Sequence, residues 1–284
     1  MVGGRWLVIK REKGAGGRGS RQNQINTADS ALSSGAAPRP NPAWRQYIGS
    51  MFIALFQGLA ARLPSRCAVC HAWPGQPLCE DCIGLFAQPR PRCKRCALAV
   101  AEADTPCAAC QAAPSPLDAA LAAVSYGYPW ADVVQEFKFR AQPAWARHLA
   151  VLMRSAPWVE PALDAAHWVL PMPLSTQRLQ SRGFNQAWLL AQALSPAKAR
   201  AQWLLRIRDT PAQSSLAGKE RLANVAKAFA IDPLRQRDLE GKNVLLVDDV
   251  MTSGASLRAA ALPLRQAGVR RVTALVFARA ETTQ

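Results

Sequence analysis

The chain has 284 residues, half of them hydrophobic, and a formal net charge of +16. This length suits one or two domains with a real core. No apolar run reaches the roughly 18 residues needed to span a bilayer, and there is no convincing secretory signal, so we expect a cytoplasmic protein. The positive charge suits a polyanionic partner such as nucleic acid or anionic lipid, although a GC-rich genome also produces Arg-rich proteins.

Residues 1–43 are rich in Gly, Ser, Arg, Asn and Pro and show no periodicity, which predicts disorder. Their Arg-rich, acid-poor composition is also that of an organelle transit peptide. We prefer to interpret residues 1–50 as a disordered extension upstream of the true start. Met51 is then the first residue, because it begins the first segment with a structured pattern.

Residues 51–63 place apolar side chains at helical spacing behind Ser50, a good N-cap, so a short helix is expected. One interpretation packs its apolar face on the protein itself. The other places that face on a partner or on a membrane surface, which makes the protein peripheral at the inner membrane.

All eight cysteines occur as four Cys-x-x-Cys pairs. Each pair is a knuckle whose two thiolates can face one metal ion, and two knuckles complete a tetrahedral site. The sequence therefore predicts two structural zinc sites, and the spacing allows either sequential or interleaved pairing of the knuckles. The expected ligands are Cys67, Cys70, Cys79, Cys82, Cys93, Cys96, Cys107 and Cys110.

A redox dithiol is the competing interpretation, but four pairs exceed what one dithiol needs. The spacing instead indicates metal binding in a reducing compartment. Zinc binding, about 10–16 kcal/mol per site in zinc-finger peptides, would provide most of the folding energy of so short a segment. The basic residues at 90–95 are either a solvated face or a contact for nucleic acid.

After a linker at residues 111–117, apolar runs and helical patterns alternate, as in a mostly parallel sheet flanked by helices. Strands are expected at residues 120–128, 167–174, 244–247 and 272–279. Helices are expected at residues 130–139, about 143–153, 184–194, 219–229 and 256–262.

Two Arg-rich segments suit a pyrophosphate group, because guanidinium forks and the N–H groups of a helix start bind such anions. Residues 178–186 precede a helix, and residues 206–216 form a polar loop of the kind that closes over a charged substrate. For the second segment an ordinary surface loop is an equal alternative. The candidate residues in these segments are Arg178, Arg182, Asn185, Gln186, Arg206 and Gln213, and Arg221 is added from the helix expected to follow.

Residues 244–256 carry the strongest functional signal. An apolar strand leads to Asp248 and Asp249, and small hydroxyl residues with Gly254 then lead to a helix. Ligands of open α/β sheets bind at this end of a strand. The carboxylates suit sugar hydroxyls or hydrated Mg²⁺, and the loop and helix N–H groups suit phosphate, which together describe a phosphorylated ribose. The alternative is two solvated carboxylates at a helix cap.

This stretch resembles the phosphoribosyl pyrophosphate (PRPP) motif of type I phosphoribosyltransferases, with Ser256 where Thr is more usual. The resemblance implies that PRPP binds there together with Mg²⁺. The residues expected to bind it are Asp248, Asp249, Val250, Thr252, Ser253, Gly254, Ala255 and Ser256.

Over about residues 51–279 the chain resembles the ComF family of competence-associated phosphoribosyltransferase-like proteins. Four blocks match in order: the Cys-rich segment, residues 171–186, residues 210–229 and the PRPP-like motif. The resemblance implies a type I phosphoribosyltransferase fold at residues 115–284. Before it, at residues 51–114, a short helix and a double zinc ribbon are expected.

The resemblance also implies a role in handling single-stranded DNA during natural transformation or DNA metabolism, with partners in DNA uptake or a helicase. Two alternatives are an active phosphoribosyltransferase of nucleotide salvage, with a base or an amine as acceptor, and a regulator that senses PRPP. The sequence assigns no catalytic residue, because the three histidines lie outside the motif: His71, His148 and His167.

Overall fold

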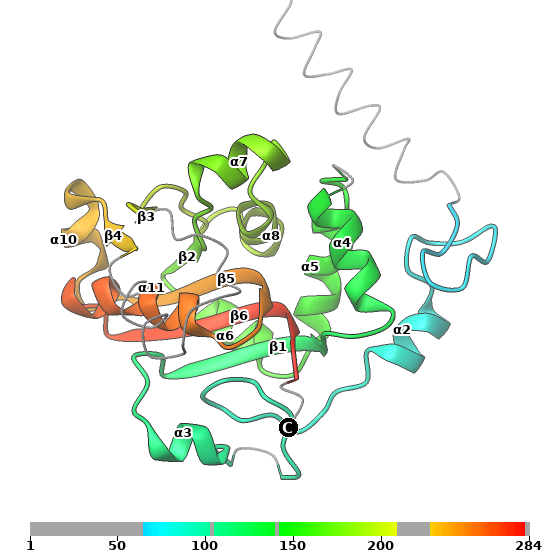
Figure 1. Cartoon of the computed structure of the whole chain (residues 1–284), viewed down its shortest axis with the longest axis horizontal. Coiled ribbons are helices and arrows are strands. Elements are labelled where there is room, and N and C mark those ends of the chain that lie inside the picture. The colour runs from blue at the N-terminus through cyan, green and yellow to red at the C-terminus, as the bar shows by residue number, and fades with distance from the viewer. Residues whose placement is uncertain (1–64, 103–104, 140–141, 209–227, 282–284) are drawn as a thin grey trace, which may run out of the picture. The chain divides into compact units, whose positions relative to one another are not determined.

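A computed structural model of the chain describes residues 65–102, 105–139, 142–208 and 228–281 (Figure 1). The described residues belong to one compact unit, Leu63–Gln284. The predictions for residues 1–64, and those for Gln213 and Arg221, lie outside the described residues.

Four parallel strands form the central sheet in the order β1-β6-β5-β2. Each pairs in parallel with its neighbour, and Val247 of β5 lies between Pro171 of β2 and Leu275 of β6. Strands buried on both faces need nearly continuous apolar sequence, which explains the runs seen in the central pair. The bounds are β1 Ala119–Ser125, β2 Trp168–Pro171, β5 Asn243–Met251 and β6 Arg271–Arg279.

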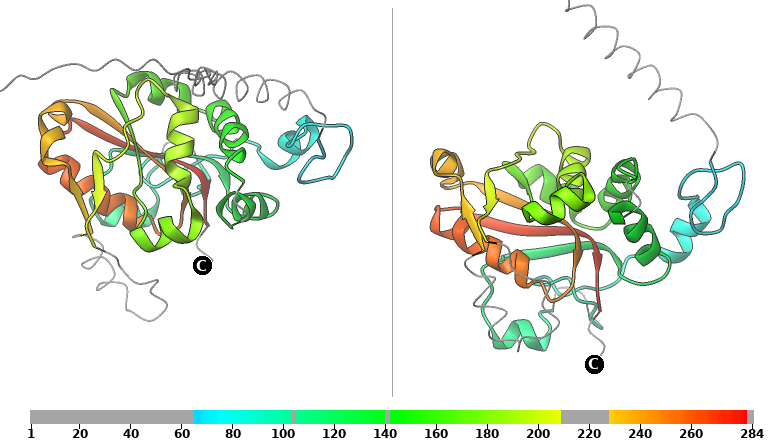
Figure 2. Two further views of the ribbon diagram at one scale, coloured as in Figure 1. Left: turned by 90° about the horizontal axis from the view of Figure 1, so that it is seen from above. Right: turned by 45° about the horizontal axis from the view of Figure 1, so that its top comes forward.

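Helices cover both faces of this sheet (Figures 1 and 2). Leu245 and Val247 of β5 face a core shared with α4, α5, α6 and α8, while Val244 and Leu246 face a second core shared with α11. This alternation is the two-residue period of a strand. The bounds are α4 Trp130–Phe139, α5 Trp145–Ser155, α6 Val159–Ala165, α8 Gln186–Leu194 and α11 Ala255–Gln266.

Smaller elements surround these layers. Strands β3 and β4 pair antiparallel in a two-stranded sheet, and the Cys-rich segment contains two short helices. The indole of Trp130 donates to the carbonyl oxygen of Phe86 at 2.9 Å, which ties that segment to α4. The bounds are α2 Glu80–Phe86, α3 Ala108–Ala112, α7 Thr176–Arg182, β3 Leu204–Arg206, β4 Phe229–Ile231, η1 Pro233–Arg235 and α10 Gln236–Leu239.

The parallel α/β architecture is confirmed, and the helix at residues 130–139 is found with those bounds. Several details differ from the prediction, and three of them bear on the candidate site or its surroundings. Strand β5 continues to Met251, so the acidic pair lies within the strand rather than after it. Phe229 begins strand β4 instead of ending a helix. Helix α7 was not predicted, because it buries no side chain and so has no apolar period.

Among the described residues, no helix has the length and apolar character needed to cross a bilayer. The domain boundary predicted near residue 114 stays a prediction.

Candidate ribose-phosphate site and metal centres

The acidic pair lies near the carboxyl end of β5, just before the turn into α11 (Figure 1). The Asp249 side chain is buried, whereas Asp248 is half-buried. The backbone N–H of Asp249 donates to Oδ1 of Asp248 at 2.9 Å, which fixes the first carboxyl against the strand. The carboxyl of Asp249 forms an ion pair with a residue of another element.

That partner is Lys138, in the last turn of α4. Its Nζ lies 3.0 Å from Oδ1 of Asp249, and the two side chains are only 19% and 8% exposed. Removing one member of so buried a pair leaves a charge with neither water nor a counter-ion, which is strongly destabilising. Sequence reasoning did not select Lys138. The available signal was its position four residues after the buried Val134, on the inward face of the helix.

The pKa of Asp248 is raised to about 7. Burial is the largest cause and the neighbouring charge of Asp249 adds to it, while the positive charges of Lys138 and Arg182 offset part of the rise. Near neutral pH this carboxyl therefore exists in both forms. It can accept a hydrogen bond from a sugar hydroxyl when ionised, or donate one when protonated.

Arg182 is brought to the same place by the junction of α7 and α8. Gly183 ends α7 in the left-handed conformation, with φ 78°. The guanidinium of Arg182 donates to Oε1 of Gln186 at 3.2 Å and lies 5.1 Å from the centroid of the Phe139 ring. Burial lowers the pKa of Arg182, and the negative charges of Asp249 and Asp248 act in the opposite direction. The positive charge of Arg182 therefore interacts with the negative charges of the acidic pair.

The two amides expected near pyrophosphate are engaged within the protein. Asn185 is the N-cap of α8: its Oδ1 accepts from the N–H of Trp188 at 3.3 Å, and its Nδ2 donates to the carbonyl of Met172 at 3.0 Å. Gln186 is 1% exposed and donates to the carbonyl of Lys138 at 3.4 Å. The two amides thus connect the start of α8 to the residue after β2 and to the end of α4.

The remaining pyrophosphate candidates lie on different elements. Arg178 is exposed on α7. Arg206 ends β3, where its guanidinium lies 5.7 Å from the centroid of the Phe229 ring. A pyrophosphate-binding role for Arg178, Arg182 and Arg206 stays a prediction.

The loop after β5 presents exposed Thr252 and Ser253, and exposed Ser256 lies in the first turn of the twelve-residue α11. Gly254 caps this helix with φ 73°, and a Cβ there would lie 2.3 Å from Cε of Met251. Only glycine fits without a shift of Met251 and backbone strain. The N–H groups of the first turn and the positive dipole end of α11 suit an anion, so phosphate binding at this loop stays a prediction.

Arg279, the last residue of β6, holds the start of this loop. Its side chain is buried, and its guanidinium donates to the carbonyl oxygens of Met251 at 3.2 Å and Thr252 at 2.5 Å. Its Nε donates to the carbonyl of Cys96 at 2.8 Å. One cation therefore connects the loop after β5 to a knuckle of the Cys-rich segment.

The eight cysteines form two clusters in which all sulfur atoms lie within 4.8 Å of one another. The clusters are Cys67, Cys70, Cys79 and Cys82, and Cys93, Cys96, Cys107 and Cys110. The pairing of the knuckles is therefore sequential, and the interleaved alternative is wrong. A tetrahedron with Zn–S bonds of about 2.3 Å has S···S edges of roughly 3.8 Å. Cys70 and Cys79, and likewise Cys96 and Cys107, lie 3.6 Å apart.

The thiols of each cluster have opposed acidities. Burial acts to raise the pKa of Cys67 and of Cys93, but backbone N–H donors outweigh it and lower the two pKa values to about 6 and about 7. Burial, together with the neighbouring sulfurs, raises the pKa of Cys82 and of Cys110. Four thiolates can coexist only with a cation between them, so the donor sets fit zinc with no open position.

A first prediction concerns the zinc content of two double variants. In Cys67→Ser/Cys79→Ser both changes fall in one cluster, so about one zinc per chain should remain. Cys67→Ser/Cys93→Ser damages both clusters and should hold almost none. Elemental analysis of the purified chains checks this. If Cys67→Ser/Cys93→Ser kept more zinc than Cys67→Ser/Cys79→Ser, the knuckles would pair in the interleaved way.

A second prediction concerns pH. The folded state holds the proton of Asp248 up to about pH 7, whereas the unfolded state releases it near 3.8, so this group costs stability increasingly as pH rises between those values. Asp248→Asn removes that cost. Its melting temperature should exceed that of the wild type by a margin that grows up to about pH 7 and then levels off. Exposed Asp238→Asn is the matched control, and a margin independent of pH contradicts the assignment.

A third prediction concerns Arg279. Arg279→Lys keeps the charge but loses the forked set of guanidinium N–H donors. Carbonyl oxygens of the loop and of the second cluster then lack donors, and each unsatisfied carbonyl costs about 1–3 kcal/mol of stability. The melting temperature should fall by several degrees. In the Cys67→Ser/Cys79→Ser background, which retains only the second cluster, a chelator should extract zinc faster. Arg270→Lys, an exposed position, should change neither rate nor stability.

Comparison with known proteins agrees with this geometry. Residues 183–284 match the family described as Phosphoribosyl transferase domain. The chain is 32% identical over 169 residues to Competence protein F of Haemophilus influenzae, which covers 55% of this chain and 70% of that protein. It is 39% identical over 103 residues to Competence protein ComFC of Bacillus subtilis, which covers 36% of this chain and 40% of that protein.

DNA utilization protein YhgH of Salmonella typhimurium is 28% identical over 163 residues, or 55% of this chain and 70% of that protein. The extent of the match to Competence protein F, the phosphoribosyltransferase domain and the two Cys₄ clusters point to one family. The chain belongs to the ComF family, with a phosphoribosyltransferase fold behind an N-terminal zinc ribbon.

Proposed function

We propose that the protein binds PRPP, or a related ribose phosphate, at the carboxyl end of β5, and that it handles single-stranded DNA in natural transformation or DNA metabolism. The observation that carries the first half is the acidic pair. Asp248 and Asp249 lie near the end of β5, and an exposed hydroxyl loop and the N-terminus of α11 follow that strand directly in the chain.

The parts of the ligand fit separate groups of the site. The carboxyls of Asp248 and Asp249 hold the two ribose hydroxyls, and the loop from Thr252 to the first turn of α11 holds the 5-phosphate. Arg182 supplies positive charge for the pyrophosphate. Mg²⁺, when bound with the ligand, neutralises the charge of the pyrophosphate oxygens.

Lys138 adds a condition on binding. Without ligand, its ammonium neutralises Asp249 at 3.0 Å. A ribose hydroxyl must therefore share that carboxylate with Lys138, or displace the lysine toward the anionic ligand. Because Gln186 holds the backbone of Lys138 and contacts Arg182, the same contacts position both cations.

The DNA-handling half rests on the family and on the charge of the chain. Relatives are named Competence protein F and DNA utilization protein, and the net charge of +16 suits a polyanion. The partners expected from the family, in DNA uptake or a helicase, belong to this half of the proposal.

A second candidate function is phosphoribosyl transfer to a base or an amine, favoured by one observation. With a pKa of about 7, Asp248 can take up or release a proton at neutral pH. Departure of pyrophosphate can also be driven by charge stabilisation from Arg182, Lys138 and Mg²⁺ without a general base. Binding without turnover would instead make the protein a sensor of PRPP.

A fourth prediction tests the ligand. In calorimetric titration with PRPP and Mg²⁺, the wild type should bind about one molecule per chain. Asp249→Asn should weaken binding roughly 10- to 100-fold, because it loses a charged hydrogen-bond acceptor worth about 1.5–3 kcal/mol. Asp238→Asn should bind as the wild type does.

Absence of PRPP binding in the wild type would end the first half of the proposal. Release of pyrophosphate that needs both Mg²⁺ and an acceptor, and that is lost in Asp249→Asn, would assign the transferase. Tight binding without such release would assign the sensor.

A further inference from the structure

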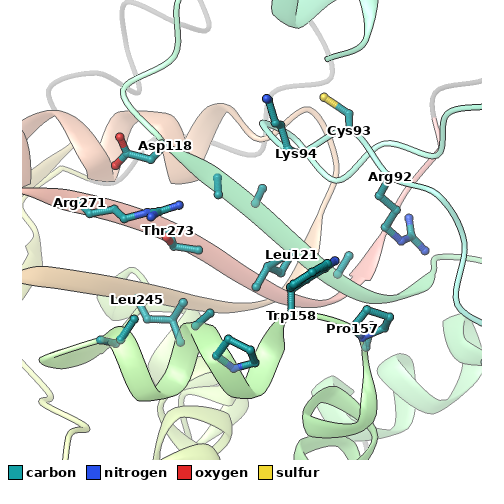
Figure 3. Close-up of a pocket in the computed structure, with 18 of the residues that line it drawn as sticks. Arg92, Cys93, Lys94, Asp118, Leu121, Pro157, Trp158, Leu245, Arg271 and Thr273 are labelled. Carbon is teal, nitrogen blue, oxygen red and sulfur yellow. The ribbon is translucent and has the colours of Figure 1, made fainter. Parts of the chain in front are cut away.

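A cavity lies away from the acidic pair, along the edge strand β1 (Figure 3). Its volume is about 680 Å³, within the roughly 300–1,000 Å³ typical of small-molecule sites. It includes Asn243 and Leu245 at the start of β5 and Arg271 and Thr273 at the start of β6. The acidic pair belongs to the other end of the same parallel strands, so the cavity is separate from the proposed PRPP site.

The cavity exists because small side chains line it. Strand β1 is built mainly of alanine, and α6 with the turn before it contributes alanine and proline, where larger aliphatic residues would close the space. Leu121 and Leu245 complete an apolar floor (Figure 3). The small lining residues are Ala119, Ala120, Ala122, Ala123, Pro157, Pro161, Ala162, Ala165 and Ala166.

An exposed indole lies over this floor. Trp158 precedes α6 in the left-handed conformation, with φ 67°, and is 68% exposed although it is one of the largest apolar side chains. Such a conformation is an outlier for a bulky residue and concentrates at functional sites. Figure 3 shows the indole beside Leu121, with Pro157 next to it. An open aromatic face of this kind stacks on flat rings such as nucleobases.

The rim is positive. Arg90, Lys94 and Arg271 are exposed, and within the described part of the chain no ion pair engages them. The carboxylate on this rim, Asp118, already accepts from Arg265 and from the N–H of Val272. The rim thus offers uncommitted cations and a carboxylate that is already neutralised, which selects an anion with an apolar, flat body.

We propose that this cavity binds a nucleotide unit, with its base on Trp158 and its phosphate on the basic rim. In Figure 3, Lys94 and Arg271 lie on opposite sides of the β1 ribbon, which favours successive phosphates of a single strand over one phosphate. The single-strand source rests on the proposed DNA handling, whereas a free nucleotide would satisfy the same chemistry. Cys93 also lines the cavity, so the second metal cluster supports its wall.

The test measures fluorescence anisotropy of a labelled oligothymidylate of about 12 nucleotides with the zinc-loaded full chain. Trp158→Leu should weaken binding roughly tenfold, since stacking contributes about 1–3 kcal/mol per base, and Trp158→Phe should retain most of the affinity. Trp73→Leu, at another exposed indole, is the matched control.

The rim is tested in parallel. Arg271→Gln should weaken binding and reduce the slope of log K against log salt by about 0.7, as expected for one lost contact to a single-stranded phosphate. Its neighbour Arg270→Gln does not line the cavity and should behave as the wild type. Because Arg271→Gln keeps Trp158, it tests the site even where Trp158→Leu folds poorly.

The outcomes separate this inference from the proposed function. Strand binding by the wild type that neither Trp158→Leu nor Arg271→Gln weakens overturns the cavity assignment and leaves DNA handling intact. Competition by free thymidine monophosphate, lost in both variants, supports the cavity and identifies a free nucleotide as a second source. Binding of anionic lipid vesicles without binding of strand or nucleotide overturns it. PRPP titration is independent of all three results.

Discussion

The buried guanidinium of Arg279 is the contact on which the rest of the site depends. It ends β6 directly opposite Met251 in the register of the sheet, and from there it reaches the carbonyls of Met251, Thr252 and Cys96. A buried cation needs several acceptors to offset its lost hydration, and here they come from two parts of the chain. Arg279 therefore joins the zinc ribbon to the loop after β5, because one guanidinium contacts both.

The acidic pair poses the opposite problem, because two adjacent carboxyls lose hydration together. The chain meets it in two ways, by pairing Asp249 with Lys138 and by raising the pKa of Asp248 so that it holds a proton part of the time. Both arrangements can be reversed by a ligand that brings hydroxyl donors and an anion. The acidic pair is thus neutralised by groups of the protein itself, and the proposed ligand would replace those partners with its own.

Sequence alone predicted what local pattern encodes: four cysteine pairs, the apolar runs of β5 and β6, helix α4, and the acidic pair before a glycine loop. It could not choose between knuckle pairings, because both satisfy the spacing. It missed Lys138 because a single lysine at a helix end looks solvated until the fold places Asp249 beside it. Trp158 and the alanines of β1 carry no motif, and their meaning depends on a cavity that only the assembled sheet creates.

Strand β6 connects the two regions of chemistry. Its first residue, Arg271, lines the cavity beside Trp158, and its last, Arg279, anchors the loop beside the acidic pair. A shared strand is not a coupling device by itself, since coupling requires an element with two arrangements that both ligands bias. Strand β6 is paired with β5 and β1 over most of its length and is almost wholly buried, which favours a single arrangement. The two proposed sites therefore lie at opposite ends of one strand, a separation that suits the proposed binding of a single strand at one and of a ribose phosphate at the other.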